Sequence, residues 1–102
     1  MQLHASALQV GTGTALQLIA APGAGYRITV VGIVISVGAT ATVVSLIDSL
    51  KAVNTKQWNL GANGFANPAS RWDLSPNAAL QYTTSAAGPT SIEVDYVIEV
   101  AP

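Results

Sequence analysis

The sequence predicts an all-β protein, a sandwich or barrel of about six to eight short antiparallel strands in one domain. Segments of alternating or β-branched hydrophobic residues recur along the chain, clusters of Gly and Pro separate them, and no convincing helix pattern competes. The chain has 102 residues, half of them hydrophobic and only 9% charged. That length suits a single small core, and the low charge excludes a disordered chain.

The first two segments are short. Residues 3–10 alternate loosely and stop at Gly11-Thr12-Gly13, so residues 1–13 are predicted to form either an N-terminal arm or a weak first strand. The single domain is then expected to cover residues 14–102. Residues 14–21 alternate more clearly and end at Pro22-Gly23-Ala24-Gly25, a turn sequence.

Residues 26–37 give the strongest strand signal. Ile28, Val30 and Val34 fall on one face of this segment, and Val31, Ile33 and Ile35 fall on the other. A strand with two apolar faces is expected to be central and covered on both sides, by the sandwich or by a neighbouring subunit.

The next segment is ambiguous between two structures. Residues 40–49 fit alternation, but Val43, Leu46, Ile47 and Leu50 also have the spacing of a helix face. We interpret it as a strand because the run is rich in Thr and Val. Residues 28–47 are uncharged and long enough to span a membrane, but the turn signal at residues 38–40 and the β-branched excess favour two strands instead.

Residues 51–77 differ from the rest of the chain. They contain every asparagine, both tryptophans, the phenylalanine and three of the four cationic residues, and they are predicted to form a long loop region with one short strand near residues 56–60. Long ordered loops are usually functional or form interfaces.

Two further strands follow the loop, at residues 79–85 and 91–100. The last one alternates. Its predicted inward residues are Ile92, Val94, Tyr96, Ile98 and Val100, and its predicted outward residues are Ser91, Glu93, Asp95, Val97 and Glu99.

The composition supplies few groups for catalysis. The only histidine, His4, is expected to be a surface residue, and Glu93 and Asp95 are expected to lie on a solvated strand face. A glycosidase-like carboxylate pair at these two positions is the minor alternative. Asp73, with Ser75 and Asn77 at alternate positions, is interpreted as turn chemistry rather than a calcium loop. The sequence therefore predicts a protein that is not an enzyme and uses no cofactor or metal.

The composition also bears on partners and location. Four cationic residues cannot neutralise a run of phosphates, so no nucleic-acid partner is expected. Without cysteine there is no disulfide framework. The N-terminal residues lack a basic region before an apolar stretch, so no cleaved signal peptide is expected, and neither is a membrane partner.

One group of residues has the chemistry of a binding surface. Trp58, Phe65, Arg71 and Trp72 lie within the long loop region, and aromatic residues and Arg are enriched at binding hot spots. The alternative is that the tryptophans close the ends of a small core. Both interpretations stay open at this point.

Residues 20–37, a Pro-Gly-Ala-Gly turn followed by Tyr-Arg and a long apolar strand, precede a Thr/Val strand, an Asn/Gly/Pro loop and a final alternating strand. This order resembles small phage virion proteins that decorate or cement capsids. The resemblance implies a compact jelly-roll-like β-sandwich, often trimeric, located on the outer surface of the virion after synthesis in the host cytoplasm. In such proteins an N-terminal arm can contact the capsid, which makes residues 1–10 a candidate contact here.

The resulting hypothesis is a structural virion protein that stabilises a phage capsid by bridging shell subunits. Its expected partners are two further copies of itself, in a homotrimer, and the major capsid protein. The alternative is a carbohydrate-binding module of a phage tail or fibre that uses Trp58 and Trp72 as stacking platforms. The candidate interface residues are Met1, Leu3, His4, Trp58, Phe65, Arg71 and Trp72.

Overall fold

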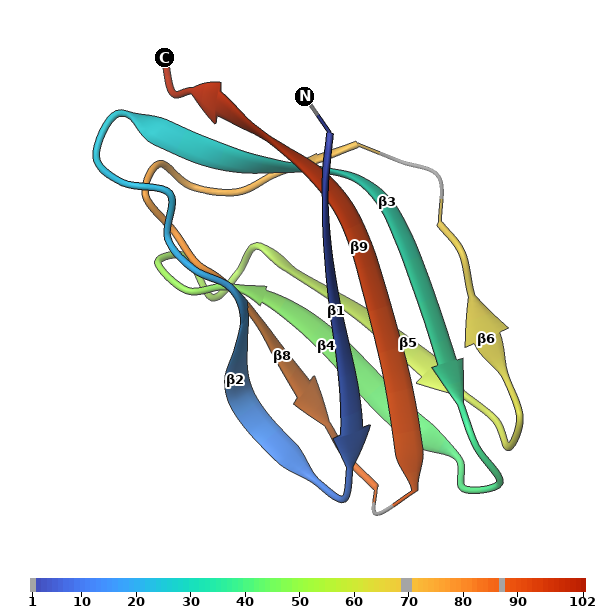
Figure 1. The fold of residues 1–102 in the computed structure, drawn as a ribbon. Coiled ribbons are helices and arrows are strands. Elements are labelled where there is room, and N and C mark those ends of the chain that lie inside the picture. Colours follow the sequence, from blue (N-terminus) through green and yellow to red (C-terminus); the bar gives the residue numbers. More distant parts are fainter. Residues whose placement is uncertain (1, 69–70, 87) are drawn as a thin grey trace.

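In a computed structural model that describes residues 2–68, 71–86 and 88–102, the chain folds into two antiparallel sheets packed face to face (Figure 1). One sheet has the order β1-β9-β3-β6, with β7 also paired to β3, and the other has the order β2-β8-β4-β5. The described residues contain nine strands. These are β1 (Leu3–Val10), β2 (Gly13–Ile19), β3 (Tyr26–Val37), β4 (Thr42–Asp48), β5 (Thr55–Leu60), β6 (Phe65–Ala66), β7 (Trp72–Asp73), β8 (Leu80–Thr84) and β9 (Pro89–Val100).

This strand order is that of a jelly roll. Successive strands cross from one sheet to the other, except at the β4–β5 hairpin and between β6 and β7, which both pair with β3. The middle pair of each sheet, β9–β3 and β8–β4, joins strands that are far apart along the chain. The predicted jelly-roll-like β-sandwich is therefore confirmed. The strands that were not predicted are β6 and β7, which have two residues each and lie inside the long loop region.

Two segments that the sequence left open are strands. Residues 3–10 pair with β9 without a break, from Leu3 opposite Tyr96 to Val10 opposite Pro89, so they belong to the sheet and do not form a free arm. Residues 42–48 form β4, in which buried and half-buried residues alternate between its two neighbours, β5 and β8. The described residues contain no helix that is long and apolar enough to cross a membrane.

A β-bulge in β3 explains why both of its faces are apolar in sequence. Val30 lies opposite Tyr96 and Gly32 lies opposite Asp95, so Val31 is an extra residue on β3. An extra residue reverses the alternation that follows it. Ile28 and Val30 point into the core before the bulge, and Ile33, Ile35 and Val37 do so after it.

The bulge corrects one expectation about β3. The strand has a single core-facing side, and Val34, on the outer side, is 42% exposed. The two apolar faces of the sequence therefore do not require a second cover. Only the first part of the outer side is covered, where β7 places Asp73 opposite the fully buried Thr29.

The final strand also departs from its predicted pattern at one end. Ile92 and Val94 are fully buried and Tyr96 packs against the core, as predicted, but Ile98 and Val100 are exposed. Strand β1 begins opposite Tyr96, and β9 continues beyond it and past the four-stranded sheet (Figure 1). Ile98 and Val100 still pair with β3, but they lie beyond the part of the sheet that the four-stranded sheet covers (Figure 1).

A buried carboxylate organises the loops at the end of β4. Asp48 is 1% exposed, and its two oxygens accept hydrogen bonds from the Leu50 and Ser75 backbone N–H groups at 2.9 and 2.7 Å. They also accept from the Ser75 hydroxyl at 2.7 Å and the Asn54 amide at 3.0 Å. Asp48 thus joins the β4–β5 turn to the segment after β7, which holds the long loop region against the sandwich.

Candidate functional site

The charged residues gather on the outer face of the five-stranded sheet. Arg27, Arg71, Asp73, Glu93, Asp95 and Glu99 all lie there, and the remaining charged residues are Asp48, Lys51 and Lys56. The strands of the other sheet place no charged side chain on their outer face, which carries amides, hydroxyls and half-buried aliphatic residues. The molecule therefore has two chemically different faces.

At one end of this face lies an ionic cluster of Arg27, Arg71, Asp73 and Glu99. One Arg71 nitrogen, Nη2, donates to both Glu99 carboxylate oxygens at 2.7 and 3.0 Å, and Arg71 Nε donates to Asp73 Oδ1 at 3.3 Å. The Nη2 atom of Arg27 lies 3.7 Å from both Asp73 and Glu99. The cluster has two cations and two anions, so its charges balance internally.

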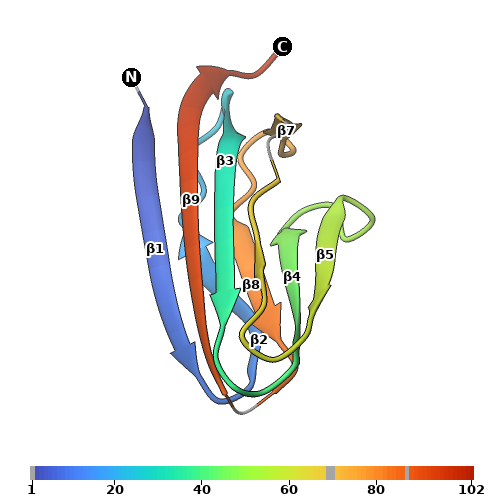
Figure 2. The ribbon, with the colours of Figure 1, turned by 90° about the vertical axis from the view of Figure 1, so that its right-hand side faces the viewer.

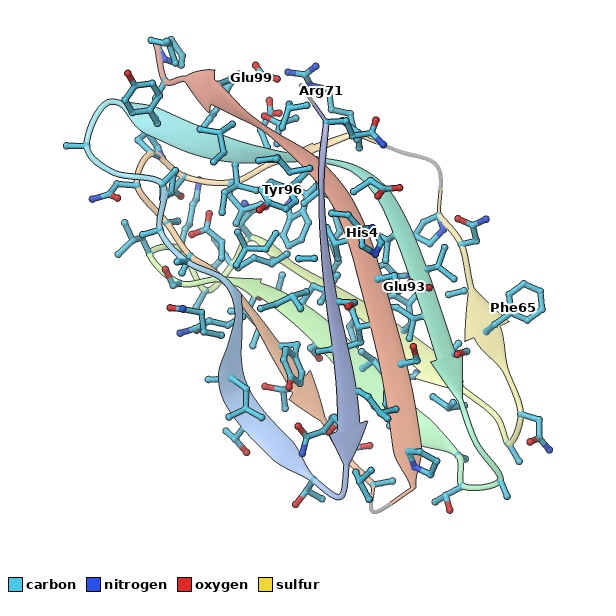
Figure 3. The ribbon with its side chains drawn as sticks, viewed as in Figure 1. His4, Phe65, Arg71, Glu93, Tyr96 and Glu99 are labelled. Atoms are coloured by element: carbon cyan, nitrogen blue, oxygen red, sulfur yellow. The ribbon has the colours of Figure 1, made fainter. Side chains whose placement is uncertain are left out.

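The ionic cluster changes how Arg71 can act. The side chain of Arg71 is more than half exposed, as expected for a contact residue, but its Nε and Nη2 groups already donate to Asp73 and Glu99 (Figure 3). A carboxylate on a partner would have to share Arg71 with these two acids. This contact could not be predicted from the sequence, because residues 71 and 99 become neighbours only through the pairing of β3 with both β7 and β9.

The middle of the face carries a histidine cluster of His4, Glu93 and Asp95 (Figure 3). His4 lies opposite Asp95 in the β1–β9 pair, with 2.7 Å between His4 Nδ1 and Asp95 Oδ1 and 3.4 Å between His4 Nε2 and Glu93 Oε1. The hydrogen bond to Asp95 raises the pKa of His4, and the negative charges of Asp95 and Glu93 add to the effect. Sequence reasoning placed His4 on the surface but missed this cluster.

The histidine cluster offers little for catalysis. Its three side chains are about half exposed and lie on an open strand face. The imidazole contacts both carboxylates, so the two acids do not flank an open substrate position, as a glycosidase pair must. Among the described residues, no group of His, Cys, Asp or Glu has the arrangement of a metal site.

The calcium-like spacing at Asp73, Ser75 and Asn77 is turn chemistry in the structure. Asp73 contacts Arg71, Ser75 donates to Asp48, and the Asn77 side chain accepts from the backbone N–H of Gly23 at 2.9 Å. The three side chains therefore have separate partners, on different elements.

The two tryptophans pack toward the core, to different extents. Trp72 is 5% exposed because it pairs with Val30 on the core side of β3, and its Nε1 donates to Asn54 Oδ1 at 2.7 Å. Trp58 is half-buried and packs against the core from the edge strand β5. The interpretation of Trp72 as an exposed stacking platform is therefore wrong.

The far end of the outer face is apolar and exposed. Phe65 is 73% exposed on β6, while Leu8 and Val10 are 71% and 70% exposed on β1, and Val34 lies between them on β3. We call these four residues the apolar end. Of them, only Phe65 was a predicted interface residue (Figure 3). Leu8 and Val10 could not be predicted as interface residues, because only the pairing of β1 with β9 shows that their side chains point outward.

The remaining candidate interface residues divide between the two sides of the sheet. His4 and Arg71 lie on the outer face with Phe65, whereas Leu3 is half-buried on the inner side of β1. Met1 lies outside the described residues.

A shallow hollow elsewhere carries no titratable side chain and is lined by Ala41, Thr42, Val43, Asn59, Leu60, Gly61 and Ser85.

Comparison with known proteins supports the fold through structure alone. No family model matches the sequence, and no curated protein matches it. A chain in the acidic stable capsid structure of Helicobacter pylori bacteriophage KHP30 is similar to this one with a TM-score of 0.67 and 13% identity, over 100% of this chain and 94% of that chain. A chain in the cyanophage Pam1 capsid asymmetric unit has a TM-score of 0.49 and 19% identity, over 94% and 82% of the two chains. The KHP30 likeness bears out the predicted resemblance to phage virion proteins at the level of the fold.

Proposed function

We propose that this chain is a non-enzymatic structural protein of a phage virion, which decorates the outer surface of the capsid and stabilises it by bridging shell subunits. The observation that carries the proposal is the likeness, over the whole of this chain, to a chain of the KHP30 capsid structure.

The proposed contact to the shell is the outer face of the five-stranded sheet. This face combines exposed apolar residues at one end with charged residues along the rest, which is the mixed chemistry of a protein interface. Phe65 and Arg71 lie toward opposite ends of it (Figure 3). The proposed partner is the major capsid protein, and the proposed assembly is a homotrimer formed after synthesis in the host cytoplasm.

A trimer would make weak contacts effective. Three copies of one modest contact, held on a rigid body, raise the overall affinity by a factor of about 10² to 10⁴ when all three can engage together. The burial of Trp72 removes one of the two stacking platforms on which a carbohydrate-binding module depended, and the other, Trp58, packs against the core, so that alternative is not proposed.

The proposal is tested by attachment to undecorated heads of the same phage. Purified protein is mixed with heads, sedimented and quantified, and its mass in solution is measured separately by light scattering. We expect saturable binding and a mass of three chains. Failure to sediment with heads would contradict the decoration role, and a monomer at micromolar concentration would contradict the trimer.

A further inference from the structure

Strand β1 is an edge strand without the usual protection against pairing with another strand. It ends the order β1-β9-β3-β6 and lies at the outer edge of the molecule (Figure 2). An edge strand presents unpaired backbone N–H and C=O groups, and proteins usually protect such edges with Lys, Pro, bulges or very short strands. Residues 3–10 contain neither proline nor any acid, lysine or arginine. Their pairing with β9 has no register shift.

The other three edges are each protected in one of these ways. Strand β2 has two register shifts and a positive φ of 48° at Ala15. Strand β5 carries Lys56, and β6 and β7 have only two residues each. The difference between β1 and the other edges occurs within one molecule, so the low charge of the chain as a whole does not explain why β1 is unprotected. Only β1, among the edges that the structure describes, is long, regular and unprotected.

We propose that the free edge of β1 pairs, antiparallel, with β1 of a second copy of this chain across a two-fold axis. Because that axis is perpendicular to the sheet, side chains on the same face of the two copies meet. The pairing is longest when a residue in the middle of β1, either Ser6 or Ala7, lies at the axis and faces the same residue of the second copy. Both are small side chains. The two sheets would then join into one continuous sheet.

The charges of the two copies are compatible with this contact. The only titratable residue of β1, His4, meets Leu8 in the register centred on Ser6 and Val10 in the register centred on Ala7. The acids of β9 are separated from those of the second copy by both β1 strands. Three strand spacings make roughly 14 Å, which exceeds the screening length of about 8 to 10 Å at physiological salt. Like charges therefore never face each other.

The contact would also cover part of the apolar end. Leu8 and Val10 are 71% and 70% exposed on the outer face of β1. In the antiparallel pair they lie beside the β1 residues of the second copy, within reach of cross-strand packing. The inference does not depend on the capsid role. A two-fold contact through β1 is separate from a three-fold contact. It doubles the mass of a monomer, and it doubles the mass of a trimer when all three edges pair with the same second trimer.

Single-cysteine variants test the pairing directly, because the chain has no cysteine of its own. Opposite residues of antiparallel strands have Cα atoms about 4.5 to 5.5 Å apart, within the range that a disulfide spans. We expect Ser6→Cys or Ala7→Cys to form an intermolecular disulfide under mild oxidation at least tenfold faster than Ser36→Cys. Ser36 is the matched control, an exposed serine on the outer face of β3, away from the edge. Equal rates at all three positions would overturn the proposal.

A second variant separates pairing from folding. Ser6 lies opposite Glu93, so Ser6→Lys places a cation beside an acid within the chain and protects the edge at the same time. In sedimentation over a range of concentrations, we expect the wild type to double its mass and Ser6→Lys to weaken that doubling about tenfold, with its melting temperature unchanged.

A wild type that never doubles its mass overturns the proposal, even if the protein binds heads. If Ser6→Cys instead forms its disulfide only with a cysteine introduced in the capsid protein on heads, the edge serves the shell and the second-copy assignment is wrong. Conversely, doubling through β1 without attachment to heads would leave this inference intact and contradict the proposed function.

Discussion

His4 and Asp95 are joined across the β1–β9 pair by a contact of 2.7 Å between His4 Nδ1 and Asp95 Oδ1. The contact links the first strand of the chain to the last one and lies in the middle of the outer face. Glu93 completes the cluster from the other ring nitrogen at 3.4 Å. Folding thus brings together three titratable groups that sequence reasoning treated separately.

The first prediction concerns pH and His4. Its pKa in the folded protein is raised above the ordinary value of 6.5, chiefly by the hydrogen bond to Asp95. The contribution to stability is therefore fully present below the unfolded pKa and is lost as pH rises through the folded one. We expect the melting-temperature advantage of wild type over His4→Gln to be larger at pH 5.5 than at pH 8.5. An advantage that is equal at both pH values would contradict the cluster.

The second prediction concerns Asp48. Burial alone would raise the pKa of this carboxyl, but hydrogen bonds from Asn54, Ser75 and Leu50 outweigh burial and lower it. Its contribution is therefore present above the unfolded pKa and lost as pH falls through the folded one. At pH 7, Asp48→Ala should reduce the free energy of unfolding by about 3 to 5 kcal/mol in urea, because buried donors lose their acceptor. A loss no larger than that of Asn59→Ala, an exposed control on β5, would refute this role.

The third prediction tests the bulge in β3. Unbroken alternation would place Val34 on the same face as Ile28 and Val30, whereas the structure exposes Val34 and buries its neighbour Ile33. We expect Ile33→Asp to destabilise the fold by several kcal/mol, since it buries an unpaired charge. Val34→Asp should cost at most about 1 kcal/mol, since the new carboxylate is exposed and only faces Glu93 across the strand pair. Chemical denaturation of the two variants decides between the registers. The reverse order of stability would show that the bulge is absent.

The longer strands and their order along the chain could be predicted from alternation and turn residues, but the two-residue strands β6 and β7 could not. Alternation alone could not show which residues of a strand face the core along its whole length. A single extra residue at Val31 makes a one-sided strand look two-sided in sequence, and the exposed end of β9 follows from where β1 begins. Both facts depend on pairing between distant segments, which no local pattern contains.

The candidate site was predictable only in part, for the same reason. Residue chemistry singled out Phe65 and Arg71, which are exposed, but also Trp72, which β7 turns inward against Val30. Leu8 and Val10 are ordinary strand residues in sequence, and only the register of β1 shows that they lie outward. A strand is known to be an edge strand only when the order of all strands in the sheet is known. The unprotected edge of β1 therefore could not be identified from the sequence.

The fourth prediction concerns the contact residues. Phe65→Ala removes an exposed ring without disturbing the core, and we expect it to lower occupancy on undecorated heads while mass and melting temperature stay normal. Arg71→Ala should also lower occupancy, because a contact that Arg71 shares with a shell carboxylate contributes about 1 to 3 kcal/mol to the binding free energy. The control is Val53→Ala, an apolar residue that is even more exposed than Phe65 and lies outside this face. Normal binding by both variants, or an equal loss with Val53→Ala, would remove these residues from the contact.

Loss of Arg71 also releases Glu99 and Asp73 from the ionic cluster, so a second variant is needed to interpret it. Glu99→Gln weakens the same internal contacts but keeps the arginine available to a partner. A direct contact through Arg71 predicts weaker binding for Arg71→Ala and normal or tighter binding for Glu99→Gln. Equal loss in both variants would assign the effect to the shape of the ionic cluster instead.

The most direct test of the decoration role is the thermal stability of heads with and without the protein. Undecorated heads are saturated with wild type, washed, and heated while release of their contents is followed by a dye. The account predicts a rupture temperature that rises with occupancy and levels off at saturation, with a smaller rise for Phe65→Ala at the same added concentration. Heads that bind the protein fully and still rupture at the undecorated temperature would contradict the claim that this chain stabilises the capsid.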